Sequence, residues 1–247
     1  MIVRMVALAL ALCVSGCLRA GSVRPPSRPI TVYRDADALA ASDKLVVMSS
    51  YYRARSMDIF RAETVAHNDI LRQADADQKS AVYLHWVGKR QEAHIAGTAL
   101  FAIVEAYSVE LVEPTVENVR AVLEKLSSRH RVESMSALQH ARAANMKELS
   151  PLLLAYVKNP LAANAGDEGQ DLFRDRLVAQ ALGVYRILNK DEGREELVRV
   201  MKFHSLDSAR LHAGLELLQL GARADVESAL QDEKSDFVAR YLKQALL

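Results

Sequence analysis

Glycine, proline and aromatic residues are scarce in this chain. Its 247 residues include 10 glycines and 6 prolines, and aromatic residues make up 6% of the total. Low glycine and proline together with abundant alanine, leucine, glutamate and arginine favour helix over strand. Half of the residues are hydrophobic, which is ample for a core. Composition therefore predicts an all-α protein.

Cysteine and net charge are also nearly absent. The two cysteines, Cys13 and Cys17, both lie in the first 17 residues, so we expect no disulfide in the body of the protein. Helix packing alone must then stabilise the fold. The formal net charge is +1, so no strong field attracts nucleic acid, and we expect none as a partner.

The first residues have the features of a targeting segment. Arg4 precedes an apolar run over residues 5–14, which is too short to span a bilayer as a helix of about 20 residues. The run ends in Val14-Ser15-Gly16-Cys17, so residues 1–16 are predicted to be a signal peptide. An ordinary secretory signal is the alternative.

The sequence Val14-Ser15-Gly16-Cys17 resembles the lipobox of bacterial lipoproteins. The resemblance implies cleavage between Gly16 and Cys17, with a diacylglycerol and an N-acyl chain on Cys17 and no other cofactor. It implies a place in the cell envelope, held by acyl chains that together anchor durably. Leu18 rather than Asp follows the cysteine, which implies the outer membrane, facing the periplasm, if the cell is Gram-negative. The Pro- and Arg-rich residues 17–34 are predicted to be a flexible tether.

Helical spacing of apolar residues begins after the tether. Residues 35–96 are predicted to form N-terminal helices, with one long or once-broken helix over 39–71 and a buried one over 81–87. Helical pairs are then expected over 98–126, 132–157, 172–203 and 206–231, with a polar loop at 162–170. Thr115 and Ser150 are the expected N-caps for residues 116–126 and 152–157.

The last 42 residues carry a repeat-like pattern. Ala209-Arg210 opens one helix, Gly221 closes it, and Asp232 ends the next. This order resembles a HEAT or armadillo-like repeat. Over residues 97–247 the resemblance implies helical hairpins stacked as a short right-handed α-solenoid, with an irregular helical bundle as the alternative. It also implies arginines that bond an acid or a carbonyl of the adjoining repeat. The candidate arginines are Arg131, Arg176, Arg210 and Arg240, and the candidate acids are Asp191, Asp225 and Asp232.

A stacked helical array predicts a non-catalytic scaffold that binds another envelope protein. If stacking follows the family pattern, polar residues of the second helices face the partner. These candidates are Arg120, Glu124, Tyr156, Arg199 and Lys202. No His-Glu-x-x-His, Gly-x-Ser-x-Gly or phosphate-binding glycine motif occurs, so neither catalytic nor metal-binding residues are predicted.

Two other functions remain open from the sequence. The first is an envelope enzyme or small-ligand binder with a site near His85, Glu92 and His94. The second is a structural lipoprotein that self-associates through a helix over residues 39–60.

Overall fold

The computed structural model describes residues 26–57, 61–94, 97–125, 131–160 and 168–247, with the backbone alone for 92–94, 97–99 and 168–173. The chain divides into two compact units. The sheet unit runs to Arg34 and includes Met48–Glu110, and the helical unit comprises Asp35–Val47 and Leu111–Leu247. The predicted signal peptide, Cys17 and most of the polar loop lie outside the described residues.

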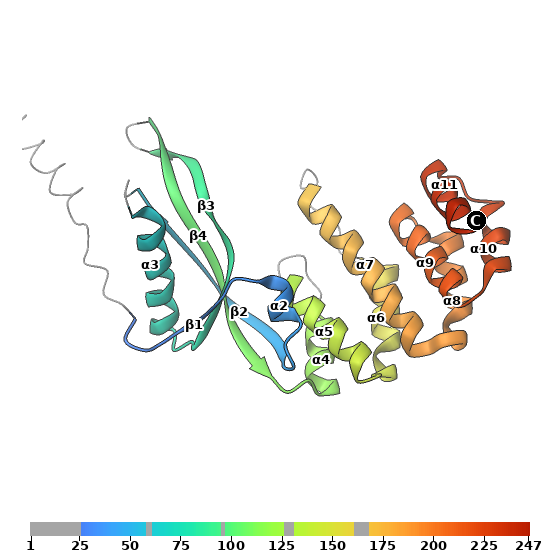
Figure 1. The fold of residues 1–247 in the computed structure, drawn as a ribbon, viewed down its shortest axis with the longest axis horizontal. Coiled ribbons are helices and arrows are strands. Elements are labelled where there is room, and N and C mark those ends of the chain that lie inside the picture. The colour runs from blue at the N-terminus through green and yellow to red at the C-terminus, as the bar shows by residue number, and fades with distance from the viewer. Residues whose placement is uncertain (1–25, 58–60, 95–96, 126–130, 161–167) are drawn as a thin grey trace, which may run out of the picture. The chain divides into compact units, whose positions relative to one another are not determined.

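The sheet unit contains four strands and one helix (Figure 1). The strands are β1 (Thr31–Tyr33), β2 (Leu45–Ser56), β3 (Ala81–His94) and β4 (Gly97–Val112), in the order β1-β3-β4-β2. β1 runs parallel to β3, and β3 runs antiparallel to β4. The helix α3 (Ala62–Ala76) packs on the sheet. β2 and β4 also contribute residues to the helical unit.

One stripe of α3 and one face of the sheet form the core of this unit. Ala66, Ile70 and Ala74 recur every four residues, which places them on one side of the helix. Their partners alternate along the strands, as expected for one face of a sheet. These strand residues are Tyr52, Ala54, Val82, Leu84, Val104 and Ala106.

A β-bulge at His85 changes which residues of β3 face α3. Leu84 pairs with Ala106 and Trp86 pairs with Glu105, so His85 is the extra residue. Beyond the bulge, Val87 rather than Trp86 lies opposite Val104.

The predicted tether is shorter than residues 17–34. The backbone N–H and hydroxyl of Ser27 donate to Asp75 Oδ2 at 2.7 and 2.6 Å, and Arg28 Nε donates to Asp75 Oδ1 at 2.9 Å. These hydrogen bonds lower the pKa of Asp75 to about 2. Because β1 follows at Thr31, the chain joins the sheet unit from Ser27 onward.

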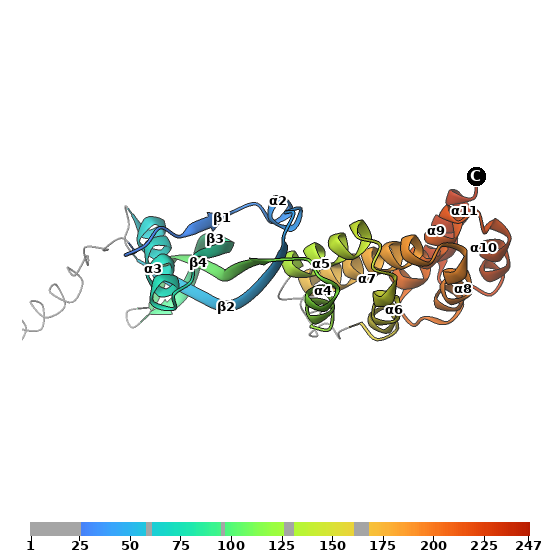
Figure 2. The same ribbon diagram turned by 90° about the horizontal axis from the view of Figure 1, so that it is seen from below.

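The helical unit is built from two rows of helices (Figures 1 and 2). One row comprises α4 (Val116–Leu123), α6 (Ser150–Lys158), α8 (Arg194–Phe203) and α10 (Arg223–Leu230). The other comprises α5 (Arg131–Ala143), α7 (Glu168–Asn189), α9 (Asp207–Gln219) and α11 (Asp236–Ala245). The short α2 (Ala36–Ala40) packs against α5, and 3₁₀ turns lie at Lys147–Leu149 and Lys190–Gly193.

The helix starts match the sequence in part. Thr115 caps α4 as predicted, since its hydroxyl accepts from the Asn118 N–H at 3.2 Å. Ser150 is instead the first residue of α6, after the N-cap residue Leu149. The Ser150 hydroxyl accepts from Asn189 Nδ2 at 2.8 Å, which joins α6 to the end of α7.

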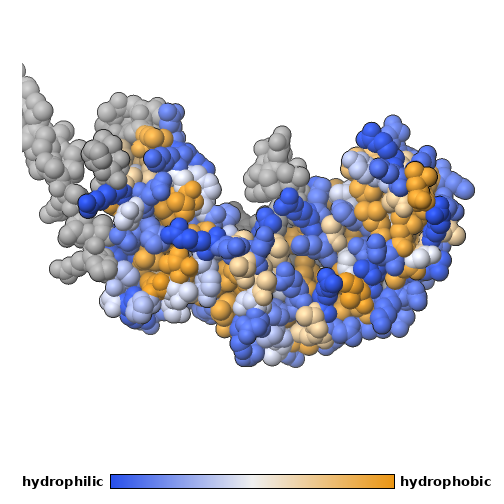
Figure 3. All heavy atoms as spheres, in the orientation of Figure 1, coloured by the Kyte–Doolittle hydropathy of each residue, from blue (hydrophilic) through white to orange (hydrophobic). Residues whose placement is uncertain are grey.

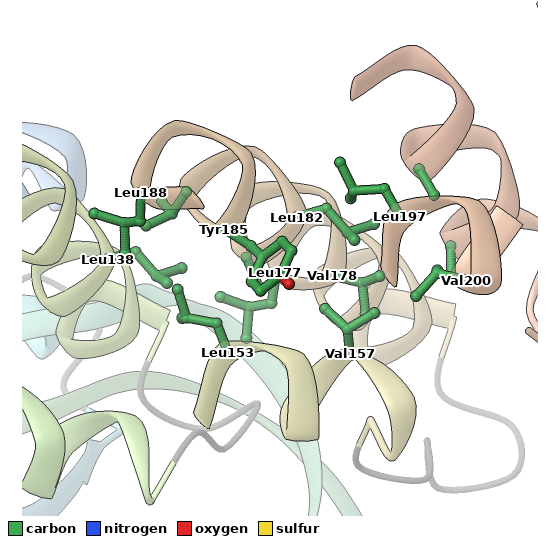
Figure 4. Close-up of a cluster of buried hydrophobic side chains, with 14 of the residues drawn as sticks. Leu138, Leu153, Val157, Leu177, Val178, Leu182, Tyr185, Leu188, Leu197 and Val200 are labelled. Atoms are coloured by element: carbon green, nitrogen blue, oxygen red, sulfur yellow. The ribbon is translucent and has the colours of Figure 1, made fainter. Parts of the chain in front are cut away.

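The core of the helical unit is centred on α7. Its buried residues Leu177, Val178, Leu182 and Tyr185 contact side chains from both rows (Figure 4). These neighbours include Leu138, Leu153, Val157, Leu197 and Val200. The long helix therefore holds the two rows together.

Arg210 makes the kind of connection that the repeat resemblance implies. Its Nε and Nη2 atoms donate to the two carboxylate oxygens of Glu233, both at 3.0 Å, and Nη1 donates to the His204 carbonyl at 2.8 Å. Burial alone would raise the pKa of Glu233, but the bonds from Arg210 and the Ser235 N–H outweigh it and lower that pKa. The acid is Glu233, not the predicted Asp232.

The predicted all-α solenoid is wrong, because a mixed four-stranded sheet makes this an α/β protein with 20% strand. Residues 45–56, 81–94 and 97–112 are strands, where helices were predicted over 39–71, 81–87 and 98–111. The predicted dimer helix over 39–60 is likewise replaced by α2 and β2. Ala81, Val82, Tyr83 and Leu84 are all buried, whereas His85 and Val87 are exposed. A short continuous apolar run of this kind is shared by a buried strand and a buried helix.

The contact between Gly214 and Leu242 predicts a stability difference between two glycine substitutions. A Cβ at Gly214 would lie 2.7 Å from Leu242 Cδ1, in the fully buried contact of α9 with α11. A Cβ at Gly183 would lie 3.3 Å from Glu216 Oε1, the end of a flexible side chain. Both changes gain about 1 kcal/mol of helix propensity, but overpacking at Gly214 costs about 1–3 kcal/mol.

We therefore expect Gly214→Ala to lower the free energy of unfolding and Gly183→Ala to leave it equal or higher. Urea unfolding followed by circular dichroism measures both. Equal stability of the two variants would contradict the described α9–α11 packing.

Candidate functional site

A groove of about 450 Å³ lies across α5, α7 and α9 in the helical unit. Its apolar lining consists of Met135, Leu138, Ala179, Val184 and Ile187. Its polar lining consists of Gln139, Arg142, Gln180, Arg186, His212 and Glu216. The volume is within the range of about 300–1,000 Å³ that is usual for binding sites.

The surface is hollowed here because α7 presents small residues. Ala179 and Gly183 lie one helical turn apart on the same face of α7 and both line the groove. Gly183 has no side chain, and Glu216 Oε1 approaches the position that its Cβ would occupy. The hollow therefore follows from the choice of small residues at two positions of one helix.

An ion pair joins two walls of the groove. Arg186 Nε of α7 donates to Glu216 Oε2 of α9, and the two side chains are 24% and 19% exposed. His212 lies one turn before Glu216 on α9. Burial lowers the pKa of His212, and the nearby carboxylates of Glu216 and Asp175 offset this only in part. His212 is therefore held neutral beside a satisfied ion pair.

Three arginines on the groove's face are exposed. Arg142 lines the groove, Arg131 lies one turn before Met135 on α5, and Arg176 lies one turn before Gln180 on α7. Among the described residues, none of the three has a hydrogen-bond or ion-pair partner. The predicted bonds from Arg131 and Arg176 to a neighbouring repeat are not seen among the described residues.

The five predicted partner-binding residues lie outside this groove, in the row of α4, α6 and α8. Arg120 and Glu124 are exposed at the end of α4. Tyr156 of α6 packs against the core, and burial raises its pKa to about 12. Arg199 and Lys202 of α8 are exposed, and Arg199 pairs with Glu196 at 3.0 Å.

Two of these residues, Arg199 and Lys202, line separate hollows near the end of α8. Arg199, Phe203, His204 and Lys158 line a cavity of about 330 Å³, and Lys202 and Phe203 line another of similar volume. Phe203 is 78% exposed. Hydrophobic side chains reach the surface elsewhere among α8–α11 as well (Figure 3). The side chain of His204 is fixed, because Nε2 bonds the Val157 carbonyl at 2.8 Å and Nδ1 accepts from the Leu206 N–H at 3.0 Å.

The alternative site near His85, Glu92 and His94 is not assembled. His85 is exposed at the bulge, with its ring 5.7 Å from that of Tyr107. Glu92 is seven residues further along β3. A strand rises about 3.3 Å per residue, so Glu92 lies roughly 20 Å away. In the predicted helix His85 and Glu92 would have been about two turns apart. In the extended strand they are much further apart.

In the described part of the chain, no group of three or more His, Cys, Asp or Glu residues is placed to hold a metal ion. None of the described helices has the length and apolar character needed to cross a bilayer. Comparisons with protein families, with curated proteins and with solved structures found no match. The groove must therefore be interpreted from its own chemistry.

The sequence contained a signal for this groove that was missed. Arg131, Met135, Leu138 and Arg142 follow the i, i+4, i+7, i+11 spacing of one helical stripe. Small residues at 179 and 183 on the next long helix indicate a shallow place beside that stripe. Together they mark an apolar surface with arginines at its ends.

The lowered pKa of His212 predicts a loss of stability in mild acid. In the unfolded chain His212 titrates near 6.5, and in the folded protein it titrates lower. Between these values the unfolded chain binds more protons, so stability falls as pH decreases below about 6.5. Replacement His212→Gln should reduce this fall, measured as the free energy of unfolding in urea at pH 7.5 and 5.0. An unchanged pH dependence in His212→Gln would contradict the assignment.

Proposed function

We propose that this chain is a lipid-anchored envelope protein that binds another protein in the groove of α5, α7 and α9 and catalyses no reaction. The observation that carries the proposal is the groove itself. It is open and has an apolar floor, and its single acid is already paired with Arg186. Such a surface suits the side chains of a partner, because apolar contact gives affinity and polar groups at the border give orientation.

The lipid anchor predicted at Cys17 supports the same proposal independently of the groove. The sequence Val14-Ser15-Gly16-Cys17 follows an apolar run and resembles a lipobox. Acylation at Cys17 would hold the protein at a membrane, and Leu18 favours the outer membrane if the cell is Gram-negative. A tether ending before Ser27 would connect the anchor to the sheet unit. The folded units would then be presented to other proteins of the envelope.

Site-specific photo-crosslinking in the native host tests the binding function. Gln180 of the groove is replaced by p-benzoylphenylalanine, and exposed Glu117 of α4 is replaced as the matched control. We expect a discrete adduct with one other protein from position 180 and none from position 117. No adduct, or equal adducts from both positions, would contradict the groove as the binding site. An adduct between two copies of this chain would favour self-association.

The lipid anchor has its own test with an internal control. Metabolic labelling with palmitate should mark the wild type and Cys13→Ala, but not Cys17→Ala, because only Cys17 follows Val14-Ser15-Gly16. The Cys17→Ala protein should also leave the membrane fraction. Retained label in Cys17→Ala, or loss of label in Cys13→Ala alone, would show that the lipobox assignment is wrong.

A further inference from the structure

The arginines of the helical unit divide into two groups. Arg174, Arg186, Arg194, Arg199, Arg210 and Arg223 each pair with a carboxylate. Five other described arginines, Arg120, Arg131, Arg142, Arg176 and Arg240, have no such partner among the described residues. Three of these five, Arg131, Arg142 and Arg176, lie on the groove's face of α5 or α7. Exposed arginines without partners contribute little to folding stability. The position of these three beside one groove therefore points to a role outside the fold.

The spacing of Arg131, Arg142 and Arg176 indicates the length of the ligand that they would bind. Arg131 and Arg142 are eleven residues apart on α5, which is about 16 Å at a rise of 1.5 Å per residue. Arg176 lies on the neighbouring helix, one turn beyond Gln180. The three arginines are thus spread along a surface of apolar and polar side chains rather than gathered at a single point. An elongated occupant of about three helical turns matches this length.

We propose that the occupant of the groove is an acidic amphipathic helix of the partner protein. Its apolar stripe would pack on Met135, Leu138 and Ile187, and its carboxylates would pair with Arg131, Arg142 and Arg176. Binding of an amphipathic helix in a groove is a common recognition mode, and arginine suits carboxylates because it donates two parallel hydrogen bonds. This proposal rests on the proposed function and specifies the chemistry of the partner.

Other anionic partners fit the observations less well. Single-stranded nucleic acid is bound by stacking its bases on several aromatic side chains, whereas the described lining of the groove contains one ring, the half-buried imidazole of His212, and no Phe, Tyr or Trp. A lipid surface would meet the exposed arginines but would leave the hollow above Ala179 and Gly183 unfilled. An acidic helix uses both the charges and the apolar floor.

Fluorescence anisotropy tests the proposal on the mature chain in an uncharged detergent. The probe is a labelled 14-residue helical peptide with leucines on one face and glutamates beside them. Two control peptides carry glutamine in place of glutamate, or the same composition with the leucines scattered. We expect saturable binding of the probe, about tenfold weaker binding of the glutamine peptide, and no binding of the scattered one.

Two sets of variants locate the binding surface. Arg131→Gln/Arg142→Gln/Arg176→Gln should weaken probe binding about tenfold and reduce its salt dependence. Arg120→Gln/Lys202→Gln/Lys234→Gln removes the same charge elsewhere and should change nothing. Ala179→Trp, which fills the groove without changing charge, should abolish binding.

Several results would overturn the proposal. These are no saturable binding of the probe, equal binding by the two triple variants, or tighter binding of single-stranded DNA or anionic vesicles than of the probe. Crosslinking at position 180 separates this failure from failure of the proposed function. A partner adduct that forms equally in the groove triple variant would leave protein binding intact and remove only the acidic helix.

Discussion

The packing of α7 between both rows of helices is the constraint on which the helical unit depends. A 22-residue helix has room for two buried stripes, and α7 uses both. Leu177, Ala181, Tyr185 and Leu188 form one stripe, and Val178 and Leu182 extend the buried surface to a second side. Contacts with α6 and α9 follow from these two stripes. One face of α7 is left without a helix against it.

That remaining face becomes the floor of the groove because of its small residues. A leucine at position 179 or 183 would fill the space between α5 and α9 and make the surface flat. Ala179 and Gly183 leave it hollow, and the Arg186–Glu216 pair fixes the distance between α7 and α9 on one side. The same packing that stabilises the unit thus determines where a partner can bind.

Helix prediction succeeded where capping and spacing agreed. Thr115 caps α4 as predicted, and the helices from α7 to α10 lie close to the predicted segments 172–203 and 206–231. The sheet was missed for a specific reason. In β3 the residues Ala81 to Leu84 are all buried, and the bulge at His85 interrupts the alternation that follows them. The result is a short continuous apolar run, which sequence alone does not assign to a strand rather than a buried helix.

The candidate site was missed for a different reason. The repeat resemblance directed attention to α4, α6 and α8, where Arg199 is already paired and Tyr156 is packed into the core. The resemblance also assigned Arg131, Arg176 and Arg210 to bonds with a neighbouring repeat; Arg210 bonds Glu233, whereas Arg131 and Arg176 make no such bond among the described residues. A sequence motif predicts where an arginine lies. Whether that arginine stabilises the fold depends on how buried it is and on whether a carboxylate or carbonyl bonds it. Glu233 is 4% exposed and holds Arg210 within the fold, whereas no acid faces Arg131, Arg142 or Arg176 among the described residues. The exposed, unpaired arginines beside the groove are therefore the best evidence for what it recognises.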